Sequence, residues 1–436
     1  MRPPTERFAD APNGRSGASR TEPAAAASAE TLAQARTRIL ALFRTRRELI
    51  RWADVTDYVD QGHVGVRALY SAVATWGSAA LIPTTQKALT VVTKLLRHAD
   101  DSNGEIQGLV DVLLQLHANL CEAAPPKPAV LADWLINFRF DGTQDYFEPD
   151  IADYTAALGA PGLALVSDRL DALEAELPTV TDRTDFARDL VARYRHRVAV
   201  ATGDPDALIA SFGEVTHSFR LQDLARALVE VGTIDQAITY AERAALAEKS
   251  WSADRAGHYW AELLHKHRSH SEELAARRLL FDRMPSAKNA LALAHIADAP
   301  NSTVSWDSLA GAVYARLETQ HPYELITTLL ERGLPERAWA AGERLTTDVG
   351  LWTTLVAARE KADPAIVIPV LIQLIQSDLA VSKPQNYKSA VGRLKQLRRA
   401  LKATGDPARF ALLMVELREE NNRRPTLLQA FDRAGF

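Results

Sequence analysis

The chain has 436 residues, enough for about two or three domains or for one long array of repeats. It carries 51 lysines and arginines against 55 aspartates and glutamates, and the resulting net charge of −4 excludes a global positive field that would attract nucleic acid or anionic lipid. Hydrophobic residues make up 47% of the chain and charged residues 24%, which is typical of a globular protein with a sizeable core.

Cysteine content and apolar segments favour the cytoplasm. Cys121 is the one cysteine, so the chain forms no internal disulfide and no cysteine-based zinc site. Residues 1–20 lack the apolar core of a signal peptide. The most apolar stretch, residues 365–381, contains Pro369 and Asp378 and is too short and polar to span a bilayer. We therefore expect a cytoplasmic protein without a membrane segment and without a cofactor.

The N-terminal residues predict a disordered arm followed by a helical domain. Residues 1–29 are rich in Pro, Gly, Ser, Arg and Ala and lack apolar periodicity, so we expect disorder there. A first helix is expected from about Thr31, because the apolar residues after it follow helical spacing. Further helices are expected at residues 69–75, 83–98, 106–123, 129–138, 144–158 and 163–176. A break at residues 178–184 then ends an N-terminal helical domain of residues 30–180.

Residues 181–436 repeat one kind of turn between Ala- and Leu-rich helical segments. In each turn a glycine ends one helix, and Asp, Thr or Pro opens the next; the glycines are Gly203, Gly232, Gly333 and Gly405. Glycine supplies the left-handed C-terminal cap, Asp or Thr the next N-cap, and Pro suits a first helical turn. The pattern predicts an all-α protein of stacked antiparallel helix pairs, a degenerate α-solenoid similar to tetratricopeptide (TPR) or HEAT repeats.

The sequence contains no recognised catalytic motif of the nucleophile-elbow, phosphate-loop, dinucleotide or zinc-protease type. Cys121 follows an apolar helical run and is expected to be a small buried hydrophobe. Four histidines lie close together: His258, His265, His267 and His270. They include no i, i+4 pair, so a polar helix end is favoured over a metal site. We expect no enzymatic activity; an enzyme with an unrecognised metal site at these histidines is an alternative.

One predicted helix concentrates positive charge on Lys388, Arg393, Lys395, Arg398, Arg399 and Lys402. Four of these cations repeat at spacings of seven, four and three residues and share a face that is able to contact a phosphate backbone. Glutamates close by in the sequence offset them, which favours a solvated or internally paired face. Three aromatic residues are candidates for a groove lined by successive helices, namely Tyr240, Trp339 and Tyr387.

Two segments carry a family resemblance. The first is the run DDSNGEIQGL at residues 100–109 with LADWL at residues 131–135, and the second is RRPTLL at residues 423–428 with FDRAGF at residues 431–436. Together they resemble the long helical region, of unknown function, of bacterial SWIM zinc-finger proteins, over residues 35–436. The resemblance implies a helical scaffold without an assigned activity. The finger itself needs a C-x-C…C-x-H ligand set that this chain lacks, so its zinc and its binding role do not carry over.

These features predict a non-enzymatic scaffold that binds a protein partner through surfaces on successive helices. The alternative is a nucleic-acid-associated accessory protein that uses the basic helix Lys388–Lys402, which the overall charge does not favour.

Overall fold

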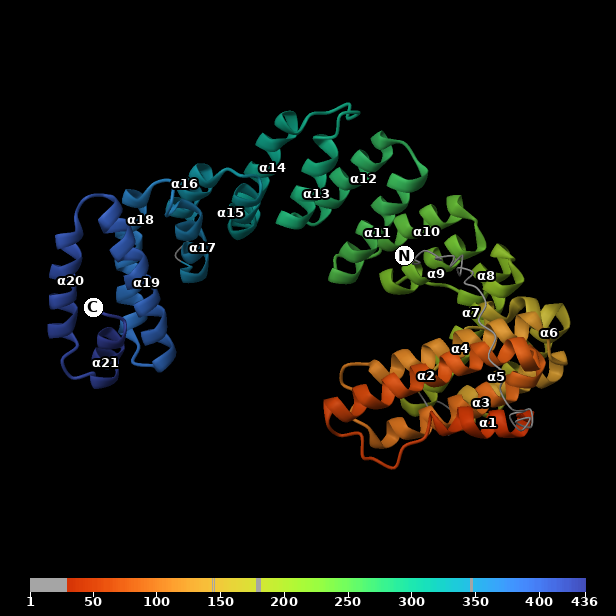
Figure 1. Cartoon of the computed structure of the whole chain (residues 1–436). Helices are drawn as coiled ribbons and strands as arrows, with labels where there is room; N and C mark the ends of the chain where they lie inside the picture. Colours follow the sequence, from red (N-terminus) through yellow and green to blue (C-terminus); the bar gives the residue numbers. More distant parts are fainter. Residues whose placement is uncertain (1–29, 143, 145, 178–181, 346–347) are drawn as a thin grey trace, which may run out of the picture. The chain divides into compact units, whose positions relative to one another are not determined.

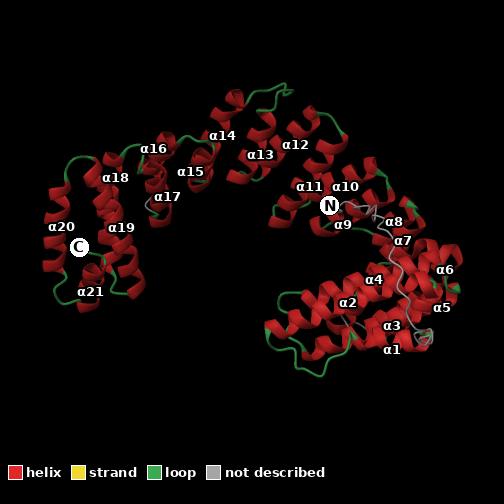
Figure 2. Cartoon of the chain, viewed as in Figure 1, coloured by secondary structure: helices red, strands yellow, loops and turns green. Residues whose placement is uncertain are grey.

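The computed structural model describes residues 30–142, 144, 146–177, 182–345 and 348–436. These residues form a succession of α-helices, labelled α1 to α21, with two short 3₁₀ helices and one isolated β-bridge between Leu49 and Ala99 (Figures 1 and 2). The predicted all-α fold is confirmed. The predicted disordered arm, residues 1–29, and the predicted domain limit at residue 180 lie outside the described residues.

The chain divides after Gly203 into two compact units. The helices of unit 1 are α1 (Leu32–Ala41), α2 (Trp52–Trp76), α3 (Ser78–Leu95), η1 (Leu96–His98), α4 (Glu105–Ala123), α5 (Pro128–Phe140), η2 (Ile151–Tyr154), α6 (Thr155–Glu176) and α7 (Asp182–Thr202). In this unit α2, α3 and α4 pack on one another, α5 packs on α6, and α6 contacts α4 and α7. The first helix starts where the sequence predicts it, with a capping box between Thr31 and Gln34.

The helix predicted at residues 144–158 is wrong over its first half. The side chain of Gln144 accepts hydrogen bonds from the backbone N–H groups of Tyr146 and Phe147 and donates to the carbonyls of Phe138 and Phe147. These side-chain bonds hold the backbone in a loop and compete with helical hydrogen bonds, although the apolar spacing favours a helix. Regular structure resumes only at η2.

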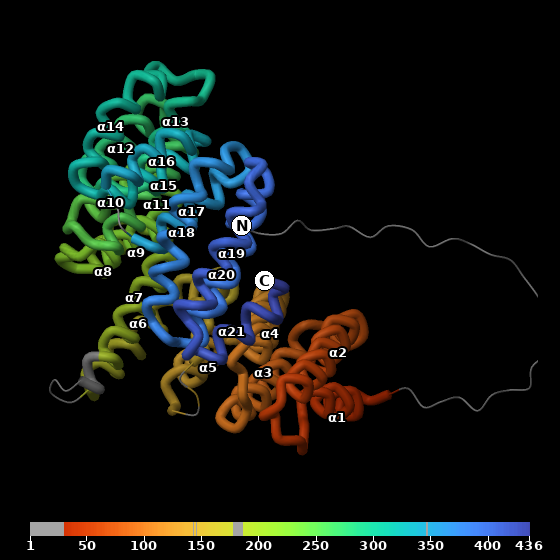
Figure 3. Tube along the Cα trace, turned by 90° about the vertical axis from the view of Figure 1, so that its left-hand side faces the viewer, coloured from red at the N-terminus to blue at the C-terminus, as the bar shows by residue number. Residues whose placement is uncertain are grey.

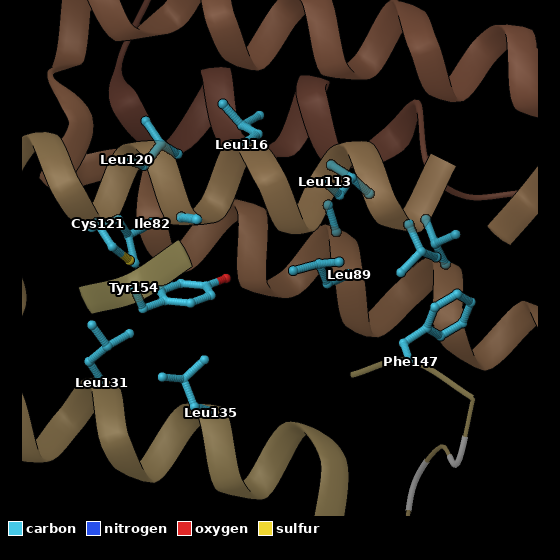
Figure 4. Close-up of a cluster of buried hydrophobic side chains, with 14 of the residues drawn as sticks. Ile82, Leu89, Leu113, Leu116, Leu120, Cys121, Leu131, Leu135, Phe147 and Tyr154 are labelled. Carbon is cyan, nitrogen blue, oxygen red and sulfur yellow. The ribbon is translucent and has the colours of Figure 1, made fainter. Parts of the chain in front are cut away.

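The core of unit 1 takes buried side chains from all of its α-helices, α1 to α7. Figure 4 shows Tyr154 of η2 between leucines of α4 on one side and Leu131 and Leu135 of α5 on the other. The apolar positions of α4 recur at helical spacing and are fully buried, which makes this helix the centre of the unit. A Cβ at Gly62 of α2 would collide with Leu109 of α4, so glycine sets how closely these two helices approach.

A chain of hydrogen bonds runs through this core. His117 is fully buried, and its Nε2 lies 3.1 Å from Gln86 Nε2, which is a donor. The proton of the neutral ring therefore sits on Nδ1, which donates to the Tyr154 hydroxyl at 3.0 Å. That hydroxyl lies 3.4 Å from the carbonyl of Leu114 and donates to it. The polar atoms of these three side chains thus find partners within the core, which a low-dielectric interior favours.

The helices of unit 2 are α8 (Pro205–Phe212), α9 (Ser218–Val231), α10 (Ile234–Leu246), α11 (Trp251–His267), α12 (His270–Arg283), α13 (Ala287–Ala297), α14 (Trp306–Gln320), α15 (Pro322–Glu331), α16 (Pro335–Leu345), α17 (Val349–Arg359), α18 (Pro364–Ala380), α19 (Pro384–Ala403), α20 (Pro407–Glu420) and α21 (Pro425–Arg433). From α8 to α20 each helix packs against the next in the chain, and α9 also contacts α11, α13 contacts α15, and α19 contacts α21 (Figure 3). Contacts to the next and the next-but-one helix are the packing of stacked helix pairs, so the predicted solenoid architecture is confirmed for this unit.

The turns between these helices have the predicted backbone. Gly203, Gly232, Gly333 and Gly405 all have positive φ, between 70° and 89°. Asp204 and Asp406 then cap the helices that follow; the Asp204 side chain accepts hydrogen bonds from two backbone N–H groups of the first turn, and that of Asp406 from one. Among the described helices, none combines the length and the apolar character that crossing a membrane requires.

The close approach of α2 and α4 predicts opposite effects for two glycine-to-alanine changes. Gly62→Ala is expected to destabilise unit 1 by about 1–3 kcal/mol, because the new methyl group displaces Leu109 in a packed core. Gly108→Ala on α4 has no heavy atom within 4 Å and is expected to stabilise the helix by about 0.5–1 kcal/mol. Urea unfolding followed by hydrogen exchange of α2 and α4 measures both changes. Equal effects would contradict the close approach.

The burial of His117 predicts a pH dependence of stability. Burial lowers the pKa of His117 to about 3, whereas the unfolded imidazole takes up a proton as the pH falls below about 6.5. Protons therefore favour the unfolded state, and this residue costs about 1.4 kcal/mol of stability per pH unit between pH 6 and pH 4. In His117→Gln this part of the slope is expected to vanish, and at pH 7–8 it is absent from both proteins. Identical slopes in urea unfolding at pH 4–6 would refute this origin.

Candidate functional site

The four histidines of the metal alternative do not converge. His258 Nδ1 lies 3.2 Å from Arg277 Nη1, and its Nε2 lies 3.7 Å from Asp254 Oδ2. His265 Nδ1 contacts Glu273 Oε2 at 2.9 Å, and Glu273 is itself buried and paired with Arg277. In the part of the chain that the structure describes, no group of three or more His, Cys, Asp or Glu side chains is placed to hold a metal ion. The contacts join α11 to α12, and the metal alternative is not favoured.

Cys121 lies on α4 in the core of unit 1, as the sequence predicts. Its Sγ is 3.7 Å from His117 Nε2, but both side chains are fully buried. Burial raises the pKa of the Cys121 thiol to about 12 and lowers that of His117, so neither the thiolate nor the imidazolium is available near neutral pH. Cysteine and histidine serve as nucleophile and base in many enzymes, but the burial of Cys121 and His117 keeps a substrate from reaching them.

The basic helix is α19, and half of its six candidate cations have internal partners. Arg393 forms a largely buried ion pair with Asp378 of α18 at 2.9 Å. Arg399 donates two hydrogen bonds to Glu360, and Arg398 donates to the carbonyl of Gly435. The other three side chains are exposed and form no ion pair with any described residue: Lys388, Lys395 and Lys402. Internal partners therefore engage half of the positive charges that the sequence places on α19.

The three aromatic groove candidates lie in different environments. The structure buries Trp339 and Tyr387 in the core of unit 2, with Trp339 3% exposed. The Trp339 ring packs edge-on against Trp352 at 5.1 Å, and its Nε1 donates to Glu343. Tyr240 is half-buried beneath Arg243. Periodicity shows that these residues belong to an apolar face, but large aromatic rings of a stacked array mostly fill the space between helices.

A groove that the sequence does not single out runs along unit 2. One hollow of about 600 Å³ lies between the start of α11, the α12–α13 turn and the end of α14, and a second of about 350 Å³ lies between α12, α13 and α14. Both are lined by Arg316 and Gln320, so the two hollows are neighbours, and we name them together the α12–α14 groove.

Positive charge dominates this groove. Its cationic side chains are Lys249, Arg278, Arg283 and Arg316, and its carboxylates are Asp254 and Asp282. Both carboxylates are already engaged, the first with Lys288 and Asn289 and the second with Arg316. Lys249 and Arg278 are exposed and form no ion pair with any described residue. Each of the two hollows is therefore lined by one exposed cation without an ion pair to a described residue.

An exposed tryptophan borders the same groove. Trp251 is the first residue of α11, and its side chain is 73% exposed, with the Arg255 guanidinium 5.0 Å from its ring centre. The backbone at this point is fixed by the cap of Ser250 on α11. The Glu248 carboxylate accepts hydrogen bonds from the hydroxyls of Ser218, Ser250 and Ser252. These bonds, first of all the one from Ser218, lower the pKa of the Glu248 carboxyl. A large aromatic side chain is thus held in solvent on a rigid helix end.

Only one sequence signal marks this site. Trp251 stands in the polar run Glu248–Ser252, where no core position is expected. The cations of the groove come from separate helices that meet only through packing, so no local sequence pattern brings them together.

Comparisons with known proteins give a family and a weak structural likeness. A search among curated proteins finds no match. Solved structures similar to this chain include the TPR domain of P58(IPK), with 12% identity, coverage of 93% of this chain and 96% of that one, and a TM-score of 0.21. Another is a circular tandem repeat protein with novel repeat topology, with 12% identity, coverage of 92% and 97%, and a TM-score of 0.18. With such low scores, the fold assignment rests on the helix order and packing described above.

The predicted relation to SWIM zinc-finger proteins stays a prediction. The matching sequence family is described as a family of unknown function (DUF6880), and its match spans residues 17–301, well over half of the chain. This protein belongs to the DUF6880 family of unknown function.

Proposed function

We propose that the chain is a non-enzymatic helical scaffold for protein–protein interaction, and that the α12–α14 groove binds an acidic peptide segment of the partner. The observation that carries this proposal is the exposed Trp251 at the border of a groove with unpaired cations. Helical arrays bind partners in depressions lined by successive helices, and such a depression accepts a peptide without enclosing it.

The groove offers two kinds of contact to a peptide: the positive charge of exposed cations and the apolar surface of an exposed tryptophan. Lys249 and Arg278 attract carboxylates of an incoming peptide, since the groove's own carboxylates are already engaged. Trp251 offers a large apolar surface with few rotatable bonds, the kind of side chain on which binding energy concentrates. The expected ligand is therefore a peptide with two or more acidic residues and one apolar or aromatic residue.

The environments of the reactive residue types that the structure describes support a binding role over catalysis. The Cys121–His117 pair is sealed in the core, and the histidines of α11 and α12 serve to join those helices. The groove is lined by cations, one exposed aromatic ring, apolar side chains and the polar residues Ser286, Gln320 and His321, and its carboxylates are held in ion pairs. The Ser286 hydroxyl caps α13 by accepting a hydrogen bond from the backbone N–H of Asn289. Such a surface is suited to binding and orienting a peptide chain.

A peptide-display selection against the full chain tests this proposal. We expect acidic peptides to be enriched, and Lys249→Glu plus Arg278→Glu to weaken their binding about tenfold or more, because two attractive contacts become repulsive. Binding is expected to fall as salt is raised from 50 to 500 mM, since these contacts are exposed to solvent.

The matched control carries the same charge change elsewhere in unit 2. Lys388→Glu plus Lys395→Glu alters two exposed, unpaired lysines of α19 and is expected to leave the affinity unchanged. Trp251→Ala is expected to weaken binding without changing its salt dependence. Equal losses in the groove variant and the α19 control, or enrichment of basic peptides, would refute the proposal.

A further inference from the structure

Helix α20 exposes an apolar face. Leu412 is 66% exposed and Val415 55%, and the exposed Ala408 and Ala411 continue the same face at helical spacing. The opposite side of the helix carries its buried residues, Phe410, Met414 and Leu417, and packs on α19. In Figure 1, α20 stands at the edge of unit 2 with α19 on its inner side.

A hollow extends this face. It has a volume of about 520 Å³, and its walls include Ala411, Met414, Val415 and the ring of Phe436. Most of the lining is apolar, with Arg398, Lys402 and Arg418 around it. We name the exposed residues of α20 together with this hollow the α20 face. The exposed apolar residues of α20 form a stripe along one helix, so an amphipathic helix is a shape that fits here.

Charge is separated along the α20 face in a way that makes it complementary to itself. Arg409 lies near the N-terminal end of the helix, whereas Glu416 and Glu419 lie near its C-terminal end. All three are exposed and form no ion pair with any described residue. A uniformly acidic or basic partner satisfies only one end of this face. An antiparallel copy of the same helix satisfies both ends.

We propose that a second copy of this chain binds the α20 face through antiparallel pairing of the two α20 helices. A two-fold axis opposite the midpoint of Pro407–Glu420 sets Leu412 against Val415 of the second copy, and the same contact recurs on the other side of the axis. It also sets Arg409 beside Glu416 of the second copy, within one turn. The helix dipoles then run in opposite directions, which is the favourable arrangement.

The pairing is expected to be weak. Two helices of 14 residues bury less than the roughly 1,200 Å² at which stable interfaces begin, so dissociation constants in the micromolar range are expected. Sedimentation velocity of the full chain at about 1 to 200 μM measures it. Wild type is expected to shift from monomer to dimer over this range. Leu412→Asp plus Val415→Asp is expected to remain monomeric, and Leu279→Asp, at an exposed leucine of α12, to dimerise as wild type does.

Charge swaps distinguish self-pairing from a general loss of folding. Arg409→Glu and Glu416→Arg are each expected to raise the dimer dissociation constant about tenfold, because like charges then face one another. The double swap is expected to restore dimerisation, and so is an equal mixture of the two single variants, in which every facing pair has opposite charges. A wild-type chain that stays monomeric at 200 μM, or swaps that fail to restore the dimer, would overturn the proposal.

Discussion

Each helix of unit 2 depends on its neighbours in the chain for the burial of its apolar side chains. Contacts run from one helix to the next and to the next but one, and the core of α12 to α21 is continuous along the array. A helix pair in such an array leaves apolar area in water unless the next pair covers it. The left-handed glycines at the turns serve this requirement, since they reverse the chain within a few residues and bring successive helices together.

The need to bury each helix against its neighbours also distinguishes polar groups that hold helices together from polar groups that are free to bind a partner. In unit 1 the polar atoms of Gln86, His117 and Tyr154 satisfy one another in the core and stabilise one packing arrangement. In unit 2 the ion pair of Arg393 with Asp378 joins α18 to α19 in a similar way. Lys249 and Arg278 differ from these groups because they are exposed, without ion pairs, and beside a groove. Unpaired charge next to an exposed tryptophan is the feature that stacking does not explain.

Local chemistry in the sequence predicts the helices, the turns and the buried cysteine, because caps, left-handed glycines and apolar spacing act within a few residues. It fails at residues 144 and 146–150, where the side chain of Gln144 competes with the helix. It also fails at Trp339, which is predicted to line a groove but is covered by a neighbouring helix, whereas the polar run around Trp251 is consistent with the exposure of that ring. The groove was not predictable at all, because Arg278 and Arg316 come from different helices and meet only after stacking.

Hydrogen exchange of the full chain, with and without a selected acidic peptide, tests the central claim most directly. The account predicts slower exchange at the start of α11, at the α12–α13 turn and at the end of α14, where the groove residues lie. It also predicts unchanged exchange in unit 1 and in α19. Protection confined to α19 or to unit 1 would contradict the assignment of the α12–α14 groove as the partner-binding site.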